Sequence, residues 1–149
     1  MNNKKLSIGD LKVVMFKRFF SEQPYFNDFL GNPYTYIKAR YYMYPSVLLV
    51  YVLLRTRITP NMVTIAYVLS GVVGGVLLSI PDFFCNVAAV FIFFNKSILD
   101  WSDGALARIK YGPTLTGHIL DEYGAIVNSI GLIVGLGFFA MHQTGYTFL

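Results

Sequence analysis

Cysteine and charge are both scarce in this sequence, and each scarcity excludes a class of protein. The chain of 149 residues has one cysteine, Cys85, so no internal disulfide can hold the fold. Charged residues make up only 13% of the chain, whereas 55% of the residues are hydrophobic and 17% are aromatic. Soluble domains carry about 25% charged residues, so this composition excludes an ordinary soluble domain and favours a membrane protein.

The N-terminal region lacks the apolar core and small cleavage residues of a signal peptide. Residues 6–20 instead place Lys12, Lys17 and Arg18 among Leu, Val, Met and Phe. This pattern is typical of an amphipathic helix on a membrane surface, and a packed cytosolic helix is the open alternative. Residues 21–40 contain two prolines, two asparagines and a glycine, and we expect turns and loop there. The net charge of +4 is explained by anionic lipid head groups and membrane orientation, without nucleic acid.

Three apolar runs are long enough to cross a membrane: 62–80, from 83 towards 99, and 116–141. The earlier run 41–54 has 14 residues, short of the roughly 20 that a crossing helix needs. If it lies in the interface, 11 of the 12 Lys and Arg residues fall on one side, with Lys96 inside a span. Basic residues concentrate on the cytoplasmic side, so we expect three crossings and a cytoplasmic N-terminus. The eleven residues are Lys4, Lys5, Lys12, Lys17, Arg18, Lys38, Arg40, Arg55, Arg57, Arg108 and Lys110.

Small residues recur within two of these runs. Gly71 and Gly75 form one G-x-x-x-G pair, and Gly131 and Gly135 form another. Such pairs let helix backbones approach closely, so we expect packing surfaces within the fold or between subunits. Trp101 is expected to face lipid or a neighbouring helix.

Three aspartates stand among residues that otherwise suit a membrane span. Asp100 and Asp103 are three residues apart, so they share one face of a helix. Asp121 lies two turns past the Tyr-Gly-Pro turn at 111–113, so it returns to the same membrane level. Carboxylates without clustered His or Cys suit Mg²⁺ or Mn²⁺. The open alternative is a structural charge network between the aspartates and nearby basic residues: Lys96, Arg108 and Lys110.

The aspartates belong to a longer motif, D-x-x-D-G-x-x-A-R, then eight residues, then G-x-x-x-D. Its fixed positions here are Asp100, Asp103, Gly104, Ala107, Arg108, Gly117 and Asp121. The motif resembles the signature of the CDP-alcohol phosphatidyltransferase family. A second match lies upstream, where residues 58–64, ITPNMVT, resemble the T-P-N-x-V-T start of that family's first core helix.

The resemblance implies an all-α integral membrane enzyme of phospholipid synthesis that uses two divalent cations, Mg²⁺ or Mn²⁺. Such an enzyme transfers a substituted phosphate from a CDP-linked donor to an alcohol and releases CMP. The donor is either CDP-diacylglycerol with a small polyol or amino-alcohol acceptor, or a CDP-linked head group with diacylglycerol as the acceptor. The motif reads only the CDP and the metals, so it leaves this choice open.

The resemblance also implies roles for individual residues at a site that faces the cytoplasm. Asn61 and Thr64 would meet the nucleotide from the side, with a helix cap after Pro60 as the open alternative. The metal ligands would be Asp100, Asp103 and Asp121, and the cytidine diphosphate pocket would be shaped by Gly104, Ala107, Arg108 and Gly117.

The sequence departs from the family pattern at one position, Ala125, where the family has a fourth aspartate. That carboxylate is expected to ligate a metal and to take the proton from the acceptor hydroxyl, so Ala125 occupies the catalytic position. Glu122 cannot replace it, because it is rotated by about 100° from Asp121 on a helix. We therefore expect little or no turnover. The alanine is either an introduced substitution or a natural variant, and a non-catalytic pseudoenzyme or interaction protein is the alternative function.

The chain also differs from the family in length. The family core has six crossing helices, whereas this sequence reaches residue 149 after the third, so we expect the N-terminal half of that fold. Residues 1–57 would form a cytoplasmic or interfacial region, and residues 58–149 a transmembrane catalytic-core fragment. Exposed helix faces would favour a homodimer.

Overall fold

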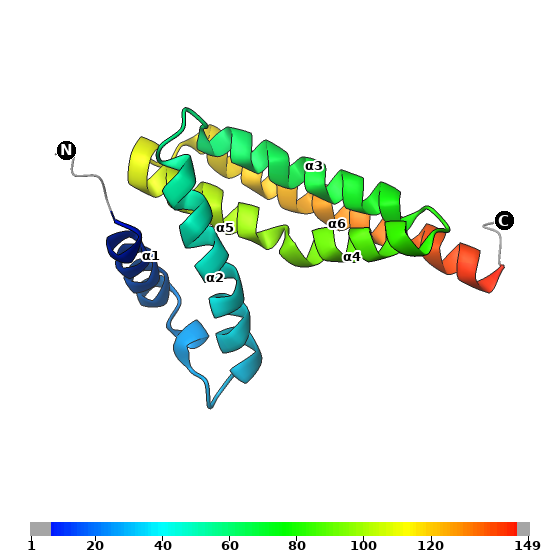
Figure 1. Ribbon diagram of the computed structural model, residues 1–149, viewed down its shortest axis with the longest axis horizontal. Coiled ribbons are helices and arrows are strands. Elements are labelled where there is room, and N and C mark those ends of the chain that lie inside the picture. The colour runs from blue at the N-terminus through cyan, green and yellow to red at the C-terminus, as the bar shows by residue number, and fades with distance from the viewer. Residues whose placement is uncertain (1–6, 146–149) are drawn as a thin grey trace.

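The structure, a computed structural model, describes residues 7–145, which form helices and connecting turns without any strand (Figure 1). This confirms the predicted all-α class. In chain order the elements are α1 (Ile8–Glu22), η1 (Pro24–Asn27), α2 (Pro33–Leu53), α3 (Pro60–Leu78), α4 (Phe83–Asn95), α5 (Ser97–Leu106), η2 (Ala107–Tyr111) and α6 (Leu115–Thr144).

Three helical stretches are long and apolar enough to cross a membrane, as the sequence predicts. They are α3, the stretch Phe83–Tyr111 and α6, with 19, 29 and 30 residues. Large apolar side chains on them are exposed, among them Phe84 at 78% and Ile133 at 69%, as lipid-facing residues are. Helix α2 has 21 residues and is not among the candidate spans. In Figure 1 it runs at a steep angle to α3 and α6.

The predicted loop at 21–40 is wrong over its second half, where α2 has already begun at Pro33. The side chain of Asn32 caps the helix by accepting a hydrogen bond from the Thr35 N–H at 3.2 Å. Proline at the first helical position needs no hydrogen-bond partner for its nitrogen, so an Asn-Pro pair starts a helix as well as it marks a turn.

The second membrane stretch is not one uninterrupted helix, because α4 ends just before Lys96 and α5 begins just after it. Hydroxyl groups of α2 bind carbonyls on both sides of this interruption. Tyr42 donates to the Phe94 carbonyl at 2.9 Å, and Ser46 donates to the Ile98 carbonyl at 3.1 Å. Burial raises the pKa of the Tyr42 phenol further above neutral pH, where the group is already protonated and can donate. Helix α2 is therefore attached directly to the helix that carries the aspartate motif.

Helices α3 and α6 pack backbone to backbone through the two glycine pairs. A Cβ at Gly131 would lie 2.6 Å from the Gly71 carbonyl oxygen, and one at Gly135 would lie 2.8 Å from the Gly75 carbonyl oxygen. No residue larger than glycine fits at this separation of the two helices. The predicted packing role of these pairs is confirmed, and the surface lies within the fold.

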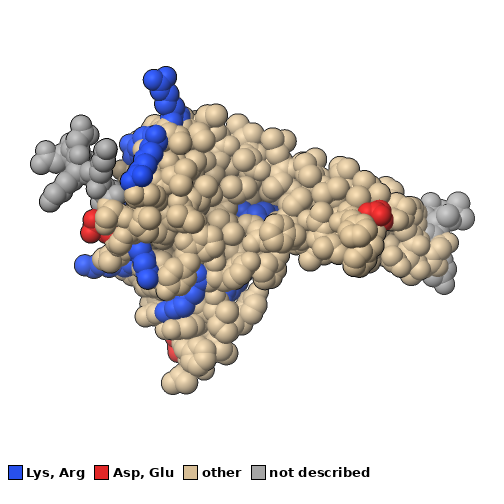
Figure 2. All heavy atoms as spheres, in the orientation of Figure 1, with Lys and Arg blue, Asp and Glu red and all other residues tan. Residues whose placement is uncertain are grey.

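Helix α1 lies against α2 and α5. Leu11 is fully buried and contacts Val47 and Val50 of α2 and Ala105 of α5. Figure 2 shows the Lys and Arg side chains gathered toward the end of the molecule where α1, α2 and η2 lie, with few on the far part of the α3–α6 bundle. Two of the eleven basic residues expected on one side of the membrane, Lys4 and Lys5, lie outside the described residues.

Candidate functional site

A buried hydrogen bond joins the two sequence motifs. The Thr64 hydroxyl donates to Oδ2 of Asp103 at 2.6 Å, and the two side chains come from α3 and α5. Thr64 is 3% exposed and Asp103 is 5% exposed. The same hydroxyl lies 3.2 Å from the Pro60 carbonyl. Thr64 therefore orients a motif carboxylate and does not cap α3, whose N-cap residue is Thr59.

A cavity of about 370 Å³ lies between the start of α3, the end of α5 and the start of α6. We call it the α6-side cavity. Tyr111, Thr114 and His118 form part of its wall. It also collects most of the residues that the sequence singles out: Asn61, Thr64, Asp103, Gly104, Ala107, Arg108, Gly117 and Asp121.

A second cavity, of about 320 Å³, lies on the other side of the motif, between α1, α2 and α5. We call it the α1-side cavity. All three motif aspartates line it: Asp100, Asp103 and Asp121. The residues common to both cavities are Asp103, Gly104, Arg108 and Asp121. The motif thus stands between two cavities.

The beginning of α6 is fixed close to the beginning of α3. Thr114 caps α6 by accepting a hydrogen bond from the Gly117 N–H at 3.1 Å. A Cβ at Gly117 would lie 3.4 Å from Oδ1 of Asn61, so the missing side chain leaves room for Asn61. The preceding turn uses Gly112, whose φ of 82° is a conformation that glycine adopts readily.

The end of the motif helix is a π-helical turn, η2, which contains Arg108 and Lys110. Such turns often occur at functional sites. Lys110 donates from Nζ to the Thr56 carbonyl at 2.7 Å, which ties η2 to the segment before α3. A Cβ at Gly104 would lie 3.3 Å from Nη1 of Arg108, so the glycine lets the arginine fold back over the helix.

A family model for CDP-alcohol phosphatidyltransferase matches residues 57–147, well over half of the sequence. The chain belongs to the CDP-alcohol phosphatidyltransferase family. Members of this family are transferases of phospholipid synthesis that act on a CDP-linked donor and an alcohol acceptor and typically use a divalent metal. No curated protein and no solved structure matches the chain.

The motif aspartates of this family member are not neutralised by basic side chains. Within residues 7–145, no Lys or Arg nitrogen lies within ion-pair distance of Asp100, Asp103 or Asp121. Lys96 lies near enough to Asp100 for the two charges to interact, but none of Lys96, Arg108 and Lys110 forms an ion pair with these aspartates in the described part of the chain. The ammonium group of Lys96 lies 5.7 Å from the centre of the Tyr67 ring instead.

Carboxylates in this setting suit a divalent cation by their chemistry. Oxygen donors of this kind are preferred by Mg²⁺ and Mn²⁺, and buried carboxylates need a compensating charge. As the side chains stand, no three His, Cys, Asp or Glu residues of the described chain converge closely enough to hold a metal ion. Asp100 and Asp121 lie within reach of each other, and all three aspartates line the α1-side cavity.

Ala125 follows Asp121 by four residues, about one turn of α6, and it is exposed and lines neither cavity. Its carbonyl accepts a hydrogen bond from the Ser129 hydroxyl at 2.9 Å. Glu122 is exposed and faces His118, with 3.8 Å between Oε1 and Nε2. Glu122 therefore does not take the place of the missing carboxylate.

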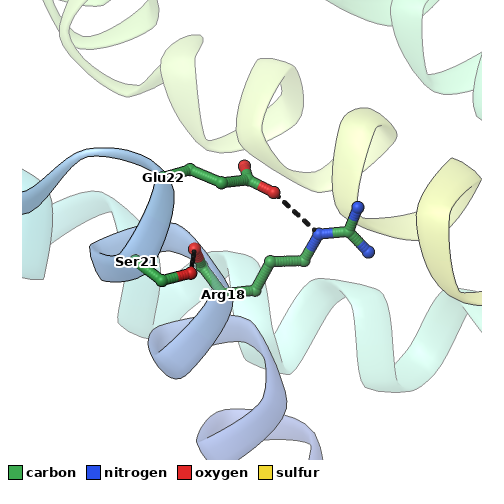
Figure 3. Close-up of polar contacts among 3 residues, drawn as sticks. All are labelled: Arg18, Ser21 and Glu22. Carbon is green, nitrogen blue, oxygen red and sulfur yellow. Dashed lines mark hydrogen bonds and ion pairs between the residues drawn. The ribbon is translucent and has the colours of Figure 1, made fainter.

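The sequence did not indicate that α1 contributes to the site. Arg18, Phe19 and Glu22 line the α1-side cavity, and the Phe19 ring packs on Trp101 with 4.8 Å between ring centres. Figure 3 shows Arg18 and Glu22 joined by an ion pair of 2.9 Å beside Ser21. The sequence feature that could have indicated this is a set of residues spaced at i, i+3, i+4 and i+7, which lie on one helix face: Met15, Arg18, Phe19 and Glu22. Trp101 faces neighbouring helices, one of the two predicted environments.

Proposed function

We propose that this protein transfers a substituted phosphate from a CDP-linked donor to an alcohol and releases CMP at the two cavities around the motif. The observation that carries the proposal is the meeting of two distant segments at one place. Thr64 of the upstream motif binds Asp103 of the aspartate motif, and both line the same cavity with Asn61, Arg108 and Asp121.

In this proposal the nucleotide occupies the α6-side cavity. Asn61 and Thr64 form its α3 wall, and Gly117 forms its α6 wall beside Asn61. Arg108 lines the cavity and carries a permanent positive charge that attracts a diphosphate. Gly104 has no side chain and Ala107 has only a methyl group, so both leave the diphosphate room to approach α5.

We propose that Asp100, Asp103 and Asp121 hold two divalent cations, Mg²⁺ or Mn²⁺. When bound, the cations would neutralise the negative charge of the diphosphate and stabilise the leaving CMP. The chain itself orients Asp103 through Thr64, and the burial of both side chains excludes water from that bond.

Turnover by the chain as written is proposed to be low, because Ala125 has no carboxylate to take the proton from the acceptor hydroxyl. The same residue favours the second candidate function, a pseudoenzyme that binds nucleotide without transferring phosphate. The two functions share the nucleotide site and differ only in catalysis.

The site is proposed to face the cytoplasm, at the level where a water-soluble substrate meets a lipid head group. The gathering of basic side chains at the site end of the molecule supports this orientation (Figure 2). The boundary between an interfacial region 1–57 and a core 58–149 and the homodimer stay predictions.

Calorimetric titration of the full chain in neutral detergent with CMP and Mn²⁺ tests the proposal. We expect Mn²⁺-dependent CMP binding that Asp100→Ala removes. The matched control is Asp82→Ala, because Asp82 is exposed and lies before α4, outside both cavities. Absence of CMP binding, or binding that Asp100→Ala leaves unchanged, would overturn the proposal.

A further inference from the structure

The α1-side cavity is built in part by a helix that the family model does not cover. The matched segment begins at residue 57, whereas α1 ends at Glu22. Both cavities reach Asp103 and Asp121, so a molecule in the α1-side cavity lies next to a nucleotide in the other one. If CDP occupies the α6-side cavity, the α1-side cavity is the space left for the second substrate.

Helix α1 is held firmly over this cavity. Leu11 anchors one end of its inner face, since it is fully buried against α2 and α5. Phe19 anchors the other end through its contact with Trp101. Arg18 and Glu22 lie on the same face, so the two anchors hold their side chains at the cavity wall.

The guanidinium group of Arg18 has unused donors. Its Nε donates to Oε1 of Glu22 at 2.9 Å, and no other hydrogen bond of its side chain occurs in the described part of the chain. In Figure 3 the terminal nitrogens of Arg18 point away from the ribbon of α1. Two parallel N–H groups on a planar cation match the oxygens of a phosphate group.

The charges around the cavity indicate why an arginine stands there. In the proposed function the divalent cations held by Asp100, Asp103 and Asp121, together with Arg108, serve the CDP-linked donor, so a phosphate group on the second substrate needs a cation of its own in this cavity. Arg18 is such a cation, and it lies on α1, the helix opposite the aspartates. A neutral alcohol would need only hydrogen bonds, without a full positive charge.

We propose that the α1-side cavity receives the acceptor and that Arg18 binds a phosphate group on it, which makes Arg18 a specificity-determining residue. This inference rests on the proposed function. The phosphate belongs either to a water-soluble phosphorylated alcohol or to a lipid head group. Glu22 holds the Arg18 side chain in place through their ion pair.

Trp101 provides a direct readout of binding, because it is the only tryptophan and lines this cavity. The first arm titrates the full chain in neutral detergent with sn-glycerol 3-phosphate, with glycerol as the uncharged probe. The second arm compares nanodiscs of phosphatidylcholine with nanodiscs that also contain phosphatidylglycerol. A response in the first arm assigns the phosphate to a soluble acceptor, and a response in the second arm alone assigns it to a lipid.

The variant Arg18→Gln should weaken the responding arm by about tenfold or more, because charged hydrogen bonds are lost. Lys17→Gln is the matched control, since Lys17 is the adjacent exposed cation and does not line the cavity. An unchanged Trp101 emission maximum without ligand shows that α1 stays in place in each variant. Equal affinity in wild type and Arg18→Gln, or an equal response to glycerol, would overturn the inference.

The calorimetric titration with CMP separates this inference from the proposed function. If CMP still binds with Mn²⁺ while Arg18→Gln has no effect on phosphate binding, the acceptor assignment alone fails. If CMP does not bind at all, the proposed function fails with it. Arg18→Gln itself should leave CMP binding unchanged, because Arg18 does not line the α6-side cavity.

Discussion

The Thr64 hydroxyl donates a hydrogen bond of 2.6 Å to the Asp103 carboxylate across 39 residues of sequence. Both groups are buried, so neither can exchange this partner for water. The bond makes the start of α3 part of the aspartate site. It also explains why a threonine in the second turn of α3 matters to residues on α5.

Replacing Thr64 with valine should destabilise the fold, because the buried carboxylate loses its donor while the side-chain volume stays nearly the same. We expect a loss of about 1–3 kcal/mol in the free energy of unfolding. Thermal unfolding in detergent, followed by circular dichroism, measures it. Thr64→Ser is the control, since it keeps the hydroxyl. A Thr64→Val variant as stable as Thr64→Ser would contradict the role of the bond.

Replacing Gly75 with alanine should separate α3 from α6. The new Cβ would lie 2.5 Å from the Gly131 carbonyl oxygen, and a backbone atom there cannot move without moving the helix. We expect destabilisation of about 1–3 kcal/mol. Gly9→Ala in α1 is the matched control, because its Cβ would meet only Ser7 Oγ at 3.7 Å. That change should be neutral or stabilising, since alanine favours helix. A stable Gly75→Ala variant would argue against backbone contact.

Introducing aspartate at position 125 should raise CMP release in the presence of Mg²⁺ and a CDP-linked donor. A positioned general base contributes about 10²–10⁴-fold, so an increase of at least a hundredfold is expected. Ser129→Asp adds the same charge one helical turn further along α6 and should not raise the rate. If Ala125→Asp releases no CMP with any donor, the enzymatic function is wrong.

The prediction that α2 lies in the interface specifies which residues should be accessible from the same side of a membrane. In vesicles, and on a Cys85→Ser background, Lys38→Cys and Arg57→Cys should react with an impermeant thiol reagent from one side. Asp82→Cys lies beyond one span, α3, and should react from the other side. Labelling of positions 38 and 57 from opposite sides would mean that α2 crosses the membrane.

Local patterns predicted much of this fold because membrane burial leaves strong marks in a sequence. A crossing helix needs a long apolar run, and close helix packing needs glycine, so α3, α6 and a packing role for Gly71 and Gly75 could be expected. The start of α2 was missed because Asn32-Pro33 has the same composition as a turn. The interruption at Lys96 was not predicted, and the hydroxyl groups that bind the carbonyls on both sides of it belong to a distant segment, α2.

The sequence by itself determined the family, the helical class and which aspartates belong to the family motif. Fixed spacing and hydropathy can be read from a single segment. Only the tertiary structure decided that Thr64 binds Asp103, that the motif stands between two cavities and that Ala125 lines neither. It also decided that Arg18 lines a cavity together with the aspartates. Such relations depend on how separate helices pack, and the spacing of residues within α1 defines a helix face without showing that it packs against α2 and α5.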